Sequence, residues 1–288
     1  MKETLYTLKN EHLTVRVSSI GAQIQSIVDS AGTEYMWSGD PAVWGSTAPV
    51  LFPICGALRE DSYTYGGKTY TLAKHGFVRT RLFECEESKD DRLVLKVAST
   101  PETMEAYPFA FEFRVIFTLE EKTLHIGYTV DNKGTNTLYY SVGAHEAYAC
   151  PEGLEAYDVV FDVNEPLVRT VLEGSYLEHT TEPVESCGNV LSMKYSHMDN
   201  DCLVFTSLQS RGARLQKRGG GRAVYVQFED CPYFVLWTKQ GAPYLCLEPW
   251  SGIPDRVDSD GVLEHKEGIT ALEPGKQKTH RHHITVLS

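Results

Sequence analysis

The sequence predicts a single all-β domain, a large antiparallel β-sandwich over residues 1–288. Three observations predict it. Apolar and polar residues alternate in many short segments, glycine-rich turn signals separate these segments, and no long amphipathic helix is evident. The length is at the upper end for one domain, but all-β folds of this size often stay single, and no proline-rich linker divides the chain.

The alternation is clearest in the segment 109–117, where phenylalanine or valine occupies every second position. Such a period of two places one face of a strand in a core. Similar patterns predict strands over 13–17, 93–97 and 124–130. Gly66-Gly67 predicts a hairpin between 63–65 and 69–72, and the run 219–221 predicts another rather than a phosphate-binding loop. Residues 185–198 could hold one or two helical turns.

The chain is acidic, with a formal net charge of -12 and a pI of about 5.3. This composition argues against binding to nucleic acid or to an anionic membrane, because both require a basic surface. No apolar run is long enough for a signal peptide or a membrane span. The 7 cysteines are scattered and form no C-x-x-C pair, which predicts reduced thiols in a cytoplasmic protein. The oligomeric state is left open.

The stretch from Tyr244 to Gly252 carries the strongest chemical signal. Tyr244 to Leu247 are expected to end a buried strand, because Pro249 cannot donate a backbone hydrogen bond, so that Glu248 lies at the rim of the sheet. A carboxylate there is costly unless it is used or paired. Trp250 offers a flat apolar face beside it. A rim glutamate paired with an arginine is the alternative interpretation.

Three other positions bear polar chemistry at strand ends or in loops. His145 follows a strand and two small residues, which leave room for its imidazole. His75 lies after a hairpin and before a glycine, although a lone histidine more often bonds a backbone carbonyl. Arg59 follows an apolar loop, and its guanidinium could bind substrate oxygens or simply face solvent. Trp237 lies on a neighbouring strand segment.

A histidine and a glutamate at strand ends can act as an acid–base pair on a neutral ligand. The sequence has no G-x-S-x-G and no H-E-x-x-H pattern, so proton transfer is favoured over covalent or metal-assisted chemistry, and no metal site is expected. The histidines of the segment 280–283 are expected to lie on a solvated edge strand.

Five short motifs in order give the chain a resemblance to a known family: G-A-x-I-x-S at 21–26, L-F-P-I-C-G at 51–56, H-G-F-x-R at 75–79, G-A-H at 143–145 and L-E-P-W at 247–250. The pattern resembles the aldose 1-epimerase (galactose mutarotase-like) family over roughly residues 3–287. That family has a large antiparallel β-supersandwich, in agreement with the alternation above. The sequence has G-A-H and E-P-W where galactose-type members tend to have T-N-H and E-T-Q, so the sugar preference is open.

The resemblance implies that Glu248 is the general base and His145 the general acid of a hexose mutarotase. It also implies that His75, Arg59 and Arg79 contact the sugar. No cofactor is required, and the expected partner is a small sugar.

Three alternatives remain. Lys74, Arg79 and Arg81 could bind the phosphate of a hexose 6-phosphate. The chain could instead bind sugar without turnover. A glycosidase would need a second carboxylate, for which Asp255 is the nearest candidate.

Overall fold

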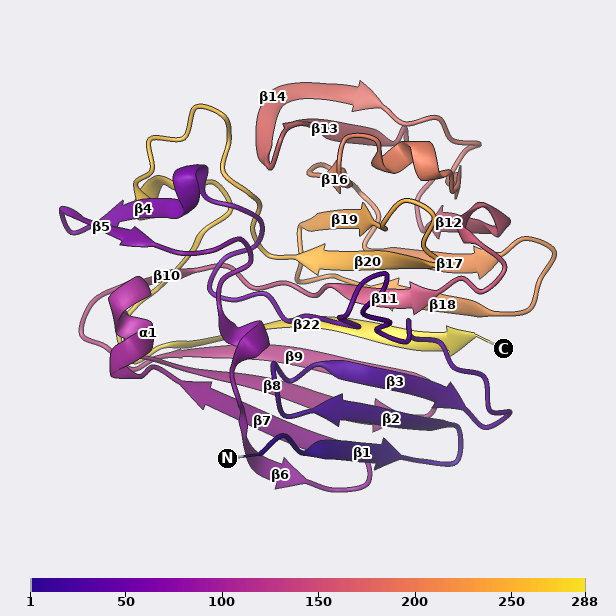
Figure 1. The fold of residues 1–288 in the computed structure, drawn as a ribbon, viewed down its shortest axis with the longest axis horizontal. Helices are drawn as coiled ribbons and strands as arrows, with labels where there is room; N and C mark the ends of the chain where they lie inside the picture. Colours follow the sequence, from indigo (N-terminus) through magenta and orange to yellow (C-terminus); the bar gives the residue numbers. More distant parts are fainter. Residues whose placement is uncertain (1, 288) are drawn as a thin grey trace.

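A nine-stranded antiparallel sheet forms one layer of the fold in the computed structural model, which describes residues 2–287 (Figure 1). Its strands, in spatial order, are β15 (Val190–Ser192), β12 (Tyr157–Phe161), β17 (Gly212–Lys217), β18 (Ala223–Gln227), β22 (Gln277–Leu287), β9 (Thr123–Asn132), β8 (Phe111–Glu120), β7 (Arg92–Ala98) and β6 (Glu84–Ser88).

A six-stranded and a three-stranded sheet together form the facing layer (Figure 1). The larger contains β11 (Glu146–Ala149), β20 (Tyr244–Trp250), β19 (Tyr233–Trp237), β16 (Leu203–Phe205), β13 (Val168–Glu173) and β14 (Tyr176–Pro183). The smaller contains β1 (Leu5–Lys9), β2 (Leu13–Ser18) and β3 (Ile24–Asp29). The segment 35–51 runs beside β11 and connects the two, through backbone bridges from Met36 to Tyr148 and from Leu51 to Gly143.

Small elements close the ends of the sandwich. Two further two-stranded sheets pair β4 (Ser62–Tyr65) with β5 (Lys68–Thr71) and β10 (Leu138–Tyr140) with β21 (Thr270–Leu272). One short α-helix, α1 (Pro101–Ala106), is capped by Thr100. Single 3₁₀ turns span Arg59–Asp61, Val78–Thr80, Leu154–Ala156, Tyr195–Met198 and Leu263–His265. No helix among residues 2–287 is long and apolar enough to cross a membrane.

The all-β prediction is confirmed, and the period-two segments are strands. Phe111, Phe113, Val115 and Phe117 of β8 point into the core between the layers, and the residues between them are only partly buried. The strand begins at Phe111, two residues later than expected, although Phe109 is also buried. Both glycine-rich turns join hairpins, β4–β5 and β17–β18. All seven cysteines are free.

The expectation of a solvated edge strand at 280–283 is wrong. These residues belong to β22, which lies between β18 and β9 in the middle of the nine-stranded sheet. His280 and His282 are buried, and the Nε2 of His282 lies 2.8 Å from a carboxylate oxygen of Glu146 in the facing layer. The alternation correctly indicated a strand, but alternation alone does not distinguish an edge from a centre.

The strand that carries Glu248 does not stop before Pro249, as expected, but continues to Trp250. Val235 pairs with Glu248, and Phe234 pairs with Pro249. The carbonyl of Pro249 accepts a hydrogen bond from the N–H of Ala144, which precedes the first residue of β11. The missing N–H of Pro249 therefore faces the segment just before β11, where the regular ladder gives way to a single bridge between Gly143 and Trp250. Glu248 consequently lies inside the sheet and is 1% exposed.

Candidate active site

The pairing of β11 with β20 brings His145 and Glu248 together. In the antiparallel register Glu146 lies opposite Leu247 and Ala147 opposite Cys246, so the next position places His145 across from Glu248. Side chains opposite each other in neighbouring strands project on the same face. On the other side of β20, Val235 of β19 pairs with Glu248 and Trp237 pairs with Cys246. This face of the sheet is the floor of a pocket.

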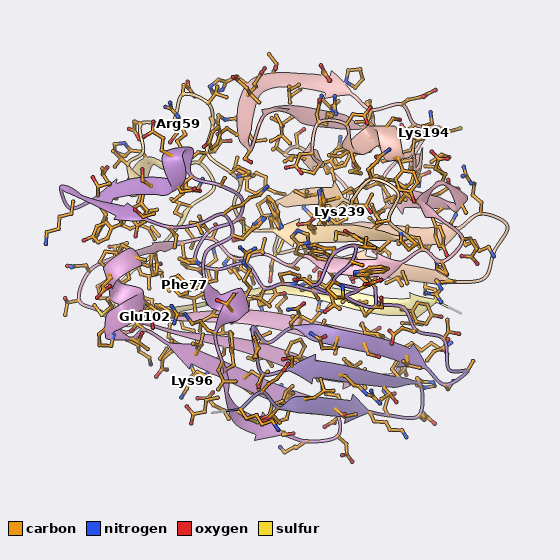
Figure 2. The ribbon with its side chains drawn as sticks, viewed as in Figure 1. Arg59, Phe77, Lys96, Glu102, Lys194 and Lys239 are labelled. Carbon is orange, nitrogen blue, oxygen red and sulfur yellow. The ribbon has the colours of Figure 1, made fainter. Side chains whose placement is uncertain are left out.

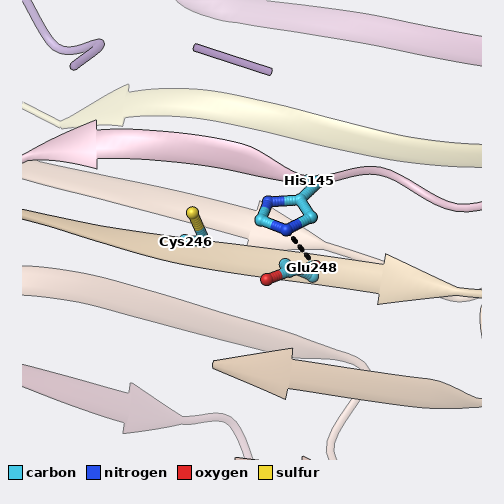
Figure 3. Close-up of side chains that lie close together, drawn as sticks. All are labelled: His145, Cys246 and Glu248. Atoms are coloured by element: carbon cyan, nitrogen blue, oxygen red, sulfur yellow. Dashed lines mark ion pairs between the residues drawn. The ribbon is translucent and has the colours of Figure 1, made fainter. Parts of the chain in front are cut away.

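The imidazole Nε2 of His145 lies 3.4 Å from a carboxylate oxygen of Glu248, as Figure 3 shows. Burial disfavours the charged form of both groups. It lowers the pKa of His145 from 6.5 to about 3 and raises the pKa of Glu248 well above 4.5. Burial therefore favours the neutral form of both groups, with a proton on Glu248 rather than on His145.

Aromatic rings enclose this pair. Trp44 stacks on His145 with ring centroids 5.3 Å apart, and Trp237 meets His145 edge-on at 5.5 Å. Trp250 donates from its indole nitrogen to the carbonyl of Ala144, which fixes the backbone next to His145. Flat apolar rings next to a polar pair suit a ligand that has both hydroxyl groups and C–H faces.

The segment before His145 approaches Trp250 closely. A Cβ on Gly143 would lie 2.6 Å from Cδ1 of Trp250 and 2.9 Å from Sγ of Cys55. Only glycine fits at this position, in agreement with the small residues expected before His145.

His75 adds a neutral donor to the pocket. Its Nδ1 accepts a hydrogen bond from the N–H of Gly56 at 3.1 Å. Burial lowers its pKa well below 6.5, so the ring is neutral and carries its proton on Nε2. The ring meets His145 edge-on at 5.7 Å. The backbone here is unusual, because His75 has a φ of 70° and Gly76 lies so close to Phe52 that a side chain would not fit.

Two cationic side chains line the pocket, one paired with a carboxylate and one without such a partner. Lys74 lies 3.4 Å from Asp201, which also lines the pocket. Arg79 is half-buried, and no carboxylate within residues 2–287 pairs with its guanidinium. Burial lowers the pKa of Arg79, the expected effect on a cation without a counter-ion. An unpaired, partly desolvated guanidinium is suited to bind ligand oxygens.

Together these residues enclose a cavity of about 210 Å³. Its lining comprises Trp44, Ser46, Pro49, Lys74, His75, Arg79, His145, Asp201, Cys202, Val235, Trp237, Glu248 and Trp250.

The comparisons with known proteins agree with this geometry. A sequence model of the aldose 1-epimerase family matches residues 4–285. The chain belongs to the aldose 1-epimerase family. A similar curated protein is the chromosomal protein LacX of Lactococcus lactis subsp. lactis. The two sequences are 34% identical over 98% of this chain and 99% of LacX.

Solved structures related to this aldose 1-epimerase family member share its fold. A galactose mutarotase related enzyme from Lactobacillus acidophilus is 33% identical, with a TM-score of 0.94 over 99% of this chain and 98% of that one. A galactose mutarotase-like protein from Lactobacillus casei is 26% identical, also with a TM-score of 0.94, over 99% and 100% of the two chains.

Six of the seven residues predicted for the site in this aldose 1-epimerase family member line the cavity: His75, Arg79, His145, Trp237, Glu248 and Trp250. Arg59 does not. Its guanidinium donates to the carbonyl of Ser259, and its N–H donates to Asp255. Figure 2 places Arg59 beside the β4–β5 hairpin.

Two charged residues considered in the alternatives also lie outside the cavity. Arg81 forms a two-point ion pair with Glu102 on the surface. Asp255 bonds Lys266 at 2.7 Å, and both are almost fully buried. Neither side chain is available to a ligand next to Glu248.

Sequence reasoning missed Trp44, Asp201 and Cys202. The signal for Trp44 was its place as the single tryptophan of the proline-rich stretch 41–60. Asp201 and Cys202 lie in a loop before β16 that has no pattern of its own.

Proposed function

We propose that the chain interconverts the α and β anomers of an aldohexose by acid–base opening and closure of the ring. The observation that carries the proposal is the His145–Glu248 pair, held across neighbouring strands in a pocket with an aromatic wall. Membership in the aldose 1-epimerase family supports the reaction type.

In the proposed reaction Glu248 takes the proton from the anomeric O1 hydroxyl while His145 gives a proton to the ring oxygen O5. The C1–O5 bond breaks as the C1=O1 double bond forms. Rotation about C1–C2 presents the other carbonyl face. The ring then closes as Glu248 returns a proton to O1 and His145 takes one from O5. Atoms and protons balance without a cofactor, and each positioned group contributes on the order of 10²–10⁴-fold.

The charge state of the pair that burial favours corresponds to one step of this scheme. Protonated Glu248 with neutral His145 is the state of the pair while the sugar is open. The cyclic sugar needs the opposite arrangement, so the proton must pass to His145 as the sugar binds. The nearby charge of Lys74 lowers the pKa of Glu248 and also that of His145, so it favours loss of the proton from the carboxyl group but not its uptake by the imidazole. Burial by itself thus biases the pair toward the charge state that the scheme assigns to the open-chain sugar.

The test is anomer exchange measured by NMR on glucose, galactose and their 6-phosphates. Faster α/β exchange with the wild-type protein, lost in Glu248→Gln, is the expected result. Binding of a sugar without faster exchange would instead support a non-catalytic sugar-binding protein. No binding and no exchange for any of the four sugars would contradict the proposal for hexoses.

A second candidate is the same reaction on a hexose 6-phosphate. Its supporting observation is the unpaired guanidinium of Arg79 near Lys74, because a phosphate binds well to such a fork. Arg79→Ala should then raise the KM for the 6-phosphate at least tenfold more than the KM for the free sugar. The matched control is Arg81→Ala, which removes an arginine from the same segment but outside the cavity. Equal effects of Arg79→Ala on both sugars would reject the phosphate site.

A further inference from the structure

Cys246 brings a third metal-binding atom to the proposed acid–base pair. It precedes Glu248 by two residues in β20, so both side chains project on the face that carries His145. The sulfur of Cys246, an imidazole nitrogen of His145 and a carboxylate oxygen of Glu248 all lie within 4.8 Å of one another. Figure 3 shows the three side chains together, and they form one such group among the residues that the structure describes.

We propose that these three side chains form a binding site for Zn²⁺ or a chemically similar divalent cation, and that the cation and the sugar exclude each other. The anomer exchange proposed above would need no metal, so the cation would act as a reversible inhibitor. This last consequence rests on the proposed function, whereas the metal site itself does not.

The donor set fits zinc. Zinc binds sulfur at about 2.3 Å and nitrogen or oxygen at about 2.0–2.2 Å, so ligand atoms of a tetrahedral site lie roughly 3.3–3.6 Å apart. The nitrogen of His145 and the oxygen of Glu248 are already 3.4 Å apart. The other separations need to shorten by no more than about 1.5 Å, which rotation of the side chains can supply. The fourth position would face the cavity and would hold water.

The charges at the site also suit a divalent cation. A thiolate and a carboxylate balance two positive charges, and the neutral imidazole completes the set. One carboxylate oxygen of Glu248, Oε2, is buried and accepts no hydrogen bond from any residue in 2–287. Lys74 is offset by Asp201, which leaves Arg79 as the opposing charge. Binding of the metal releases the proton of the thiol and the proton of Glu248, so affinity should increase with pH.

The cation and the sugar would compete directly. A metal bound to His145 and Glu248 occupies both groups that would transfer protons, and it would lie where O1 and O5 of the sugar must lie. The site would therefore be inhibitory, in contrast to metal sites that activate a bound water.

The test measures metal binding without any sugar. A Cd²⁺ titration follows the cadmium–thiolate charge-transfer absorption in a Cys187→Ser background, which removes the exposed thiol. We expect one thiolate-bound ion per chain. Cys246→Ser should abolish the absorption, and Cys202→Ser, which removes the thiol that lines the cavity, should keep it. His145→Asn and Glu248→Gln retain the thiol and should each weaken binding at least tenfold, which separates ligand loss from misfolding.

An absorption that persists in Cys246→Ser, or unchanged affinity in both His145→Asn and Glu248→Gln, would overturn the metal site. A second measurement then adds Zn²⁺ to the anomer-exchange assay, with EDTA to reverse it. If the protein binds the metal but never accelerates anomer exchange, the proposed function is rejected and the metal site stands. Exchange that is insensitive to saturating Zn²⁺ would reject the inhibitory role.

Discussion

His145 and Glu248 face each other across adjacent strands, with the imidazole Nε2 of one 3.4 Å from a carboxylate oxygen of the other. One residue lies just before β11 and the other near the end of β20, and the register of these two strands alone makes them neighbours. Burial of both groups favours the state in which the pair holds a single proton, on Glu248. Four of the predictions below follow from this pair and the backbone beside it.

Glu248→Gln should lower kcat for anomer exchange by about 10²–10⁴-fold, because the amide keeps the shape of the side chain but cannot take a proton. The measurement is NMR exchange at saturating sugar. Glu173→Gln, on the exposed end of β13, is the matched control and should leave the rate unchanged. Wild-type exchange by Glu248→Gln would remove Glu248 from the proposed mechanism.

The pH profile of kcat/KM should be a broad bell. The pair is competent while it holds one proton. It gains a second only near the lowered pKa of His145, about 3, and loses the first only at the raised pKa of Glu248, well above 4.5. Activity should therefore remain high between these limits. A narrow maximum between the ordinary values of 4.5 and 6.5 would mean that the two groups titrate as if exposed.

Stability should respond to the same two residues with opposite pH dependence. The pKa of Glu248 is raised on folding, so its contribution to stability is lost as the pH rises above 4.5. Glu248→Gln should thus increase the free energy of unfolding relative to wild type, by a margin that grows as the pH rises above 4.5.

The pKa of His145 is lowered on folding, so its contribution is lost as the pH falls below 6.5. His145→Asn should therefore stabilise the protein progressively on the acid side. Urea unfolding at several pH values measures both differences. The same pH slope for both variants would contradict the assignment.

Gly143→Ala should disturb the site through the backbone. The added methyl group would collide with Trp250 and Cys55, which costs about 1–3 kcal/mol of stability and displaces His145 two residues further on. We expect slower exchange at unchanged sugar affinity, read from kcat and KM separately. Gly127→Ala is the control, since its Cβ would lie 3.5 Å from the nearest atom. Full activity in Gly143→Ala would show that this close approach does not position His145.

Asp255→Asn should affect stability and leave chemistry intact. Its carboxylate lies 2.7 Å from the buried Nζ of Lys266, and removal of one partner of a buried pair typically costs about 3–5 kcal/mol. The exposed Asp258 pairs with His179, and Asp258→Asn should leave the stability nearly unchanged, because solvent screens such a pair. Thermal unfolding measures both. A large loss of kcat in folded Asp255→Asn would revive the glycosidase alternative.

Much of the fold and part of the site could be predicted from local patterns. The alternation in 111–117 indicated a half-buried strand because side chains in a strand alternate between its faces. The short motifs indicated His75, His145 and Glu248, and all three line one cavity. Arg59 shows the limit of this reasoning. The local sequence of an arginine after an apolar loop does not determine whether its side chain turns toward the pocket or toward Ser259.

The sequence by itself determined which segments become strands, where hairpins turn and which residues can exchange protons. These properties depend on neighbours within a few positions of the chain. The tertiary structure decided that β22 lies in the middle of its sheet, that β20 continues past Pro249, and that Trp44 covers His145. The physical reason is that an alternation with a period of two shows only on which face of a strand each side chain lies. Strand order and register are set by pairing between segments that are distant in the sequence.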